Sequence, residues 1–196
     1  MEITVRTAKS TDLSKVVELI LDAYNVRGYS PIPGAIEQYL KNDNALVLVA
    51  EKAKKEIVGT MSILFDTGKI PTDEVFPAET TRVRETSRQV AYLGSFAVRK
   101  EEWKTGMLSI GFALICEVIA RASNYDANTA VIVVNPRHVR FYSNMLGFKK
   151  VAYCDNMPGL EKAPAVMMVL DSSGIQNLLA RAPTRSRLQN ASTNPS

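Results

Sequence analysis

The chain has 196 residues, of which 46% are hydrophobic and 22% are charged. This length and composition are typical of one folded domain and exclude a chain that is disordered throughout. The net charge of +4, the two cysteines and the single histidine argue against a dedicated nucleic-acid-binding protein, a disulfide scaffold and a structural zinc site. We therefore expect no metal and no tightly bound cofactor.

Residues 2–7 alternate in polarity as a β-strand does. They contain no basic segment followed by an apolar run, so a signal peptide is not expected. The longest apolar stretches are shorter than the roughly 20 residues that span a bilayer. These features predict a cytoplasmic protein without stable membrane insertion.

The first half of the chain predicts two helices, over 13–24 and 35–41, separated by a proline-containing loop at 29–34. Residues 45–51 and 57–65 are apolar and joined by a charged turn, which predicts a hairpin. Residues 66–88 have weak periodicity. They predict either a long functional or mobile loop, or a solvated insertion with one short helix.

The second half predicts a strand over 89–98, an apolar helix over 105–122 and a strand over 129–134, which together form a right-handed βαβ crossover. A further helix from Asn135-Pro136 to Gly147 and strands over 149–153 and 165–170 follow. The prediction is an α/β fold with a mixed central sheet flanked by helices. Residues 1–170 would form the domain, and 171–196 a C-terminal segment that is partly disordered from Pro183.

The helix that begins near residue 105 presents free backbone N–H groups at its N-terminus. Lys104 and Gly106 lie there, which favours a phosphate site. An ordinary helix start is the alternative interpretation.

The order strand, loop, helix, strand, helix, followed by Asn135, Phe141-Tyr142 and Gly147-Phe148, resembles the GNAT acyltransferase superfamily. The sequence departs from that pattern in two places. The segment Trp103–Leu108 keeps one glycine of the pyrophosphate loop and has Leu108 in place of the second. One extra residue lies between Tyr142 and Gly147.

A narrower set of segments is similar to the bacterial N-acyl amino acid synthases, in particular the long-chain N-acyl tyrosine synthases, which are related to the homoserine-lactone autoinducer synthases. The segments are Ile70–Glu79, Arg84, Val90–Val98 and Pro136–Tyr142. The resemblance implies transfer of a long fatty acyl chain from an acyl carrier protein thioester to the amine of an amino acid, with tyrosine favoured. A carrier-protein donor has a phosphopantetheine arm with one phosphate, which is consistent with the missing glycine.

Direct attack of an amine on a thioester requires a base, an oxyanion donor and alignment, but no covalent cysteine. We predict His138 as the base, because a helix N-terminus disfavours its charged form. Glu101, or alternatively Glu102, would orient it or bind the ammonium group, and the alternative is a solvated acid. The GNAT resemblance implies that Tyr142 protonates the leaving thiolate, and the alternative is a core tyrosine. The backbone of residues 96–98 (Phe96, Ala97 and Val98) would align the pantetheine and bind the oxyanion, as the GNAT resemblance implies.

Two further groups are predicted from the needs of the substrates. Candidates for the acyl pocket are Tyr92, Phe96, Met107, Ile110 and Phe112, which could equally be core residues. Candidates for binding the amino-acid carboxylate are Arg82, Arg84 and Arg88, which could equally be surface charges.

The segment between Asp126 and Asp155 contains no acidic residue. Arg137, Arg140, Lys149 and Lys150 lie in it, and we predict that they dock an acidic acyl carrier protein. An ordinary solvated face is the alternative. Two other functions stay open: an acetyl-CoA-dependent small-molecule N-acetyltransferase, and an inactive GNAT-fold module that binds an acyl group or a carrier protein.

Overall fold

The computed structural model describes residues 3–29, 31, 33–104, 106–158 and 163–181. Its centre is one seven-stranded sheet with the order β1-β2-β3-β4-β5-β7-β6. The strands are β1 (Thr4–Thr7), β2 (Ala45–Lys52), β3 (Glu56–Phe65), β4 (Val90–Val98), β5 (Thr129–Val134), β6 (Lys149–Cys154) and β7 (Ala165–Leu170). Strands β4 and β5 are parallel, and the other neighbours are antiparallel. The predicted mixed sheet is confirmed.

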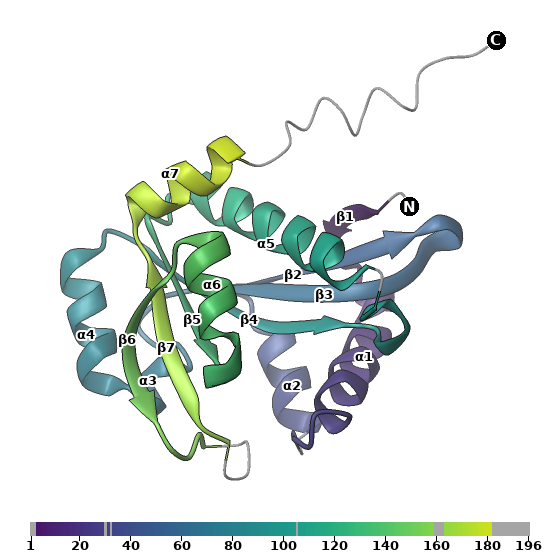
Figure 1. Ribbon diagram of the computed structural model, residues 1–196, viewed down its shortest axis with the longest axis horizontal. Coiled ribbons are helices and arrows are strands. Elements are labelled where there is room, and N and C mark those ends of the chain that lie inside the picture. The colour runs from purple at the N-terminus through teal and green to yellow at the C-terminus, as the bar shows by residue number, and fades with distance from the viewer. Residues whose placement is uncertain (1–2, 30, 32, 105, 159–162, 182–196) are drawn as a thin grey trace.

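Helices cover both faces of this sheet (Figure 1). The α-helices are α1 (Leu13–Asn25), α2 (Pro33–Leu40), α3 (Thr72–Val75), α4 (Pro77–Thr86), α5 (Met107–Asn124), α6 (Val139–Leu146) and α7 (Ser172–Arg181). The short 3₁₀ helices are η1 (Ser10–Asp12), η2 (Ala53–Lys55), η3 (Lys100–Glu102) and η4 (Pro136–His138). Helices α5, α6 and α7 share one apolar cluster with the sheet. On the opposite face, α1 and α2 form a second cluster, and α3 and α4 a third.

Alternation along the strands produces these layers. In β2, Leu48 belongs to the α5 cluster, whereas Val47 and Val49 belong to the α1 cluster. In β5, Ile132 belongs to the α5 cluster and Val131 to the α3–α4 cluster. Both faces of these strands are buried, which explains why their sequences are apolar throughout.

Helix α5 connects β4 to β5 and forms the predicted crossover. By length and composition, it is the one helix in the described part of the chain that could cross a membrane. Ile110, Leu114 and Ile119 are fully buried against the sheet, so its apolar composition is that of a central core helix.

Residues 66–88 differ from the prediction because they contain two helices, α3 and α4. The polar composition of α4 gives no helical periodicity, since the helix buries only Thr80 and Val83 and has no apolar stripe. The sequence pattern therefore did not predict this helix. Arg84 holds the segment in place through hydrogen-bonded ion pairs with Asp66 and Asp73. The segment therefore packs against the domain as a helical layer.

The chain continues as α7 beyond the expected domain boundary at residue 170. Ile175 and Leu178 are buried in the cluster around α5. The compact part of the chain thus includes α7. The tail predicted from Pro183 lies outside the described residues.

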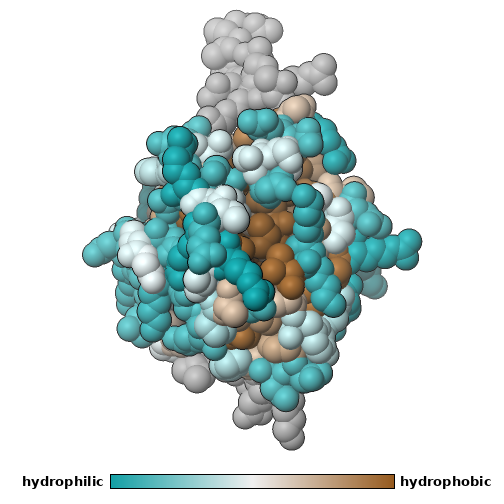
Figure 2. All heavy atoms as spheres, turned by 90° about the vertical axis from the view of Figure 1, so that its left-hand side faces the viewer, coloured by the Kyte–Doolittle hydropathy of each residue, from teal (hydrophilic) through white to brown (hydrophobic). Residues whose placement is uncertain are grey.

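A space-filling view from the side of α4 and β6 shows hydrophobic residues in a hollow at the centre of this face, with hydrophilic residues around it (Figure 2). The apolar interior is therefore not completely covered on this side.

The contact between β3 and α5 depends on Gly59, and we predict that Gly59→Val destabilises the protein. A Cβ at Gly59 would lie 2.8 Å from Ile110 Cγ2 and 3.0 Å from Leu114 Cδ1. Overpacking of this kind costs about 1–3 kcal/mol. Urea unfolding followed by circular dichroism measures the effect.

Gly34 is the matched control, because a Cβ there meets no atom within 4 Å. It lies in α2, so Gly34→Ala is expected to leave stability unchanged or raise it by up to about 1 kcal/mol. Equal destabilisation by both substitutions would contradict the close contact at Gly59.

Candidate active site

The candidate site is created where β4 and β5 separate. Their parallel pairing extends from Val90–Thr129 to Leu93–Ile132 and ends there, although both strands continue. Beyond Leu93, β4 contains a bulge at which Ser95 has a φ of 52°. The opening lies at the carboxyl ends of two parallel strands, where α/β proteins commonly bind ligands.

A cavity of about 570 Å³ occupies this opening. Ligand pockets of drug-sized molecules have similar volumes. Its walls come from the end of α1, from α2, from the β4 bulge, from the start of α5, from η4 and α6, and from residues beside β7. Residues that line it include Tyr24, Arg27, Tyr29, Tyr39, Tyr92, Gly94, Ser95, Phe96, Met107, Leu108, Val133, Asn135, His138, Tyr142, Met157 and Ala163.

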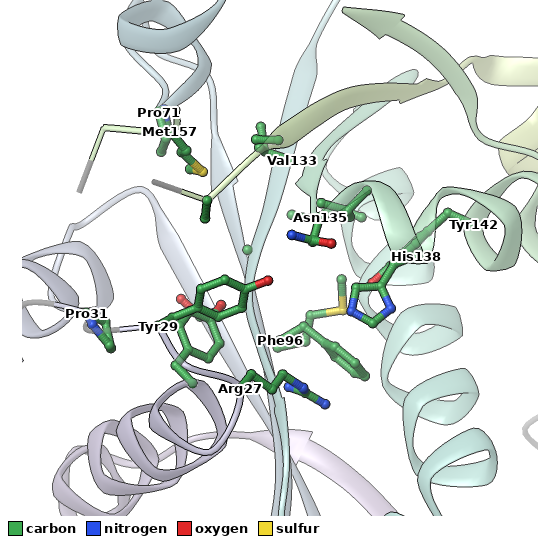
Figure 3. A pocket seen from close by; sticks show the side chains of 18 of the residues that line it. Arg27, Tyr29, Pro31, Pro71, Phe96, Val133, Asn135, His138, Tyr142 and Met157 are labelled. Atoms are coloured by element: carbon green, nitrogen blue, oxygen red, sulfur yellow. The ribbon is translucent and has the colours of Figure 1, made fainter. Parts of the chain in front are cut away.

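Figure 3 shows how the labelled residues are arranged. Arg27 and Tyr29 lie on one side and His138 and Tyr142 on the other, with Phe96 between them. Most lining side chains are apolar or aromatic, and no Asp or Glu is among the described residues that line the cavity. Such a cavity suits a long apolar chain and a few oriented polar groups.

His138 is half-buried on the cavity wall, at the junction of η4 and α6. Asn135 fixes this junction, because its side chain accepts a hydrogen bond from the backbone of Arg137 at 3.2 Å and its carbonyl accepts one from His138 at 2.9 Å. The Nε atom of Arg137 donates to His138 Nε2 at 3.3 Å. The structure thus brings His138 to the cleft, as the sequence predicted.

The pKa of His138 is lowered from its ordinary value. Burial is the largest cause, followed by the positive charges of Arg137 and Arg27. Tyr29 and Tyr142 also line the cavity beside it. His138 is therefore neutral at neutral pH, the state that a general base requires.

Arg27 is a cavity residue that the sequence did not reveal. Its guanidinium lies 4.5 Å from the ring centroid of Trp103, and burial followed by the charge of Arg137 lowers its pKa. Within the described residues, neither Arg27 nor Arg137 forms an ion pair with a carboxylate, whereas Arg137 donates to Tyr29 Oη at 2.9 Å. Arginine at a helix end is common, so only the fold distinguishes this position.

Tyr142, the predicted general acid, lies on the cavity wall. It is buried, packs edge-on against Phe141 and Phe148, and lines the cavity. Burial raises its pKa, so the hydroxyl stays protonated. Gly147 ends α6 in the left-handed conformation at a φ of 80°, and the extra residue before it is accommodated within the helix.

The structure does not bring Glu101 to His138. Glu101 lines a separate hollow together with Lys15 and Arg99, and Glu102 is buried beside Lys52, to which it is hydrogen-bonded. Both glutamates belong to η3, which turns them away from the cavity. The predicted orienting role is wrong for both residues, and the positions beside His138 are occupied by cations.

The strand edge that lines the cavity is shifted from the prediction. Phe96 lines it, together with Gly94 and Ser95, while Ala97 and Val98 are fully buried. The cause is the bulge, after which Ala97 and Val98 pair again with β3. The backbone that could meet a pantetheine arm is therefore Gly94–Phe96.

Some of the acyl-pocket candidates line the cavity, and the others are core residues. Tyr92, Phe96 and Met107 line the cavity. Ile110 is fully buried over Gly59 and Phe112 packs against the α5 cluster, so these two are core residues. The helical register of α5 explains the difference, since only its first turn and Gly111 face the opening.

The predicted carboxylate-binding arginines lie elsewhere. Arg82 is exposed on α4, 3.8 Å from Glu79, and Arg84 is engaged by Asp66 and Asp73. Arg88 faces Asp126 at 3.4 Å. Each has an acidic partner outside the cavity, so the prediction that they bind the substrate carboxylate is wrong.

The predicted phosphate residues lie at the start of α5. Gly106 precedes the helix and its N–H is bonded to the carbonyl of Glu102 at 2.8 Å, while Lys104 is exposed. Residue 105 lies outside the described residues. Leu108 is 72% exposed at the cavity rim, where it adds an apolar surface at the position of the missing glycine.

The four predicted docking residues are all exposed, but they differ in the side-chain contacts that they already make. Lys149 pairs with Asp171 at 2.7 Å, and Arg137 is bonded to Tyr29 and His138. Lys150 lies over the ring of Tyr153, and Arg140 is exposed on α6.

No cluster of three or more His, Cys, Asp or Glu side chains in the described residues could hold a metal ion. Cys116 is buried, which raises its pKa to about 11, and Cys154 lies in β6. Cys116 therefore remains a thiol and is not a suitable nucleophile.

The family model described as N-acyl amino acid synthase FeeM matches residues 15–171. The solved structure of FeeM, an N-acyl amino acid synthase from uncultured soil microbes, is similar with a TM-score of 0.79 and 20% identity, covering 93% of this chain and 99% of FeeM. No curated protein sequence matches the chain.

Acetyltransferases share the GNAT fold with this chain. An N-acetyltransferase from Staphylococcus aureus Mu50 has a TM-score of 0.63 and 14% identity, covering 88% of this chain and 99% of that one. The spermidine N-acetyltransferase from Vibrio cholerae in complex with CoA and spermine has a TM-score of 0.60 and 16% identity. The match covers 89% of this chain and 98% of that one.

We predict that the His138 imidazole titrates below its ordinary pKa of 6.5. The chain has one histidine, so the pH dependence of its imidazole NMR signals gives a single curve. Arg27→Met and Arg137→Met should each move the midpoint upward, because each removes a positive charge beside the imidazole. Arg121→Met is the control, since Arg121 pairs with Glu117 near the far end of α5. An unperturbed midpoint in the unmodified protein would contradict the described environment.

Proposed function

Because the chain belongs to the FeeM family of N-acyl amino acid synthases, we propose that it transfers a long-chain fatty acyl group from an acyl carrier protein thioester to the amine of an amino acid, with tyrosine favoured. The observation that carries the proposal is the large apolar cavity in which neutral His138 and protonated Tyr142 face the same space.

The reaction requires little covalent chemistry from the protein. His138 removes a proton from the ammonium group, the amine nitrogen attacks the thioester carbonyl carbon, and the C–S bond breaks as the amide C–N bond forms. Tyr142 gives its proton to the leaving thiolate and is reprotonated from the attacking nitrogen. The products are an amide, a thiol and one released proton, so the atoms and charges balance.

The donor end of the cavity supports a carrier-bound acyl chain. The first turn of α5 contributes Met107 and the exposed Leu108, which favour contact with an apolar acyl chain rather than with a pyrophosphate. The bulged backbone at Gly94–Phe96 adds polar groups at the opening. A single phosphate could lie near Lys104 outside the cavity.

The acceptor end favours an aromatic amino acid. Tyr24, Tyr29 and Tyr39 line the cavity near α1 and α2, and the rings of Tyr24 and Tyr29 meet edge-on at 6.2 Å. Aromatic side chains in this geometry provide further favourable ring contacts. These residues support tyrosine as the acceptor.

We predict that His138→Ala lowers kcat by about 10²–10⁴-fold, because proton abstraction loses its base. The assay combines long-chain acyl carrier protein with amino acids and detects N-acyl amino acids by mass spectrometry. Glu101→Gln is the control and should retain normal turnover, since Glu101 lies at a different hollow. Absence of any N-acyl amino acid from the wild-type reaction would overturn the proposed function. Normal turnover by folded His138→Ala would exclude the base role alone.

Reversal of two exposed charges tests the carrier protein. Arg140→Glu combined with Lys150→Glu should raise KM for the acyl carrier protein about threefold to tenfold, with an effect that shrinks at high salt. The KM for a short acyl-pantetheine thioester should not change. Lys15→Glu, an exposed reversal on α1 across the sheet, is the control. Equal effects on both donors would argue against carrier docking at this surface.

A further inference from the structure

Two arginines at the cavity have no acidic partner within the described residues. Arg27 lines the cavity, and its pKa is lowered partly by the charge of Arg137. Arg137 is exposed at the rim, where it contacts two lining residues, His138 and Tyr29. Like charges repel, and an anion bound by both arginines offsets that repulsion.

The hydrogen bond between Arg137 and His138 has a consequence for catalysis. Arg137 Nε–H donates to His138 Nε2 at 3.3 Å, so the lone pair of that nitrogen is occupied. The other ring nitrogen of this neutral imidazole then has the proton. In this arrangement Nε2 is unable to accept a proton from an amine until Arg137 moves away.

We propose that Arg27 and Arg137 bind the carboxylate of the acceptor amino acid, and that Arg137, in turning to this carboxylate, releases Nε2 of His138 as the base. The inference rests on the proposed acylation of an amino acid. Arg137 and Arg27 are positioning residues for His138 as well as ligands for the carboxylate, with the Tyr29 hydroxyl as a further donor beside Arg137.

The geometry favours the acceptor carboxylate over the donor phosphate. In an α-amino acid the amine and the carboxylate are attached to one carbon, so a base at the amine has the carboxylate within a few ångströms. Arg137, in hydrogen-bonding contact with the base, meets this requirement. The phosphate of a phosphopantetheine arm is separated from its sulfur by the whole arm, which keeps it away from His138.

Exposed arginine is well suited to this task, because its planar group binds a carboxylate through two parallel hydrogen bonds. Arg137 can rotate without repacking the core, since it is exposed. Arg27 is held more firmly by its stacking on Trp103. One arginine is therefore fixed and the other can move between His138 and the substrate.

The first test compares an amino acid with the amine that lacks its carboxylate, for example tyrosine with tyramine. In the wild-type enzyme, kcat/KM should favour the amino acid on the order of tenfold to a hundredfold, which corresponds to hydrogen bonds with a charged group. Arg27→Met and Arg137→Met should reduce this ratio to near one, mainly by raising KM for the amino acid.

Arg121→Met is the matched control and should keep the wild-type ratio, and Arg27→Lys should keep part of it because the charge is retained. Circular dichroism checks that each variant is folded. An unchanged ratio in both Arg27→Met and Arg137→Met would overturn the proposal. A wild-type enzyme that acylates no amino acid at all would instead overturn the proposed function.

The second test needs no turnover. A desamino acid such as 4-hydroxyphenylpropionate presents the carboxylate without an amine. Its binding should raise the His138 midpoint measured by NMR in the wild type, since an anion arrives and Arg137 leaves. The midpoint should respond less in Arg137→Met, where only an anion held by Arg27 acts on it, and tyramine should not raise it in the wild type. No response to the desamino acid at saturating concentration would contradict the carboxylate site, whatever the activity of the enzyme.

Discussion

The early end of pairing between β4 and β5 is the constraint on which the rest of the site depends. Only four residue pairs join the two strands, and both strands then continue along separate paths. A closed sheet at this point would leave no room for a substrate. The bulge that gives Ser95 its positive φ turns Phe96 toward the opening, while Ala97 and Val98 return to the core. Strand separation thus provides both the space and the polar backbone around it.

The helices convert this opening into an enclosed cavity. Helix α5 is anchored over β3 by the close approach at Gly59, which fixes its first turn beside the gap. Helices α1 and α2 close the opposite side with aromatic residues, and η4 places His138 at the end of β5. Helices α1, α5 and α6 each bury another face in the core, whereas η4 buries no residue. Hydrogen bonds from Asn135 hold the backbone beside His138, whereas the Arg137 side chain lies exposed at the rim.

The sequence predicted the sheet and the crossover well, because the continuous apolar runs of the central strands and of residues 105–122 are typical of buried elements. It also located His138 and Tyr142, since they belong to a family motif. It did not find α4, a polar helix that lacks periodicity, or α7. It assigned carboxylate binding to Arg82, Arg84 and Arg88 because charge alone does not identify a partner. Arg27 was missed for the same reason. Which arginine meets an acid and which meets a cavity is decided by tertiary contacts between distant segments.

The charges of the cavity favour a zwitterion as the acceptor. Arg27 and Arg137 are positive and the described lining contains no carboxylate, so a simple ammonium ion would be repelled on entry. An amino acid has a compensating negative charge beside its ammonium group and enters without that penalty. Burial, and after it the same positive charges, lower the pKa of His138 and keep it neutral until the acceptor arrives. Once the carboxylate is bound, it offsets those charges and the imidazole becomes a stronger base. One electrostatic feature, the pair of positive charges, thus favours an amino acid over a simple amine and also activates the base. The choice among amino acids depends on the walls that meet the side chain.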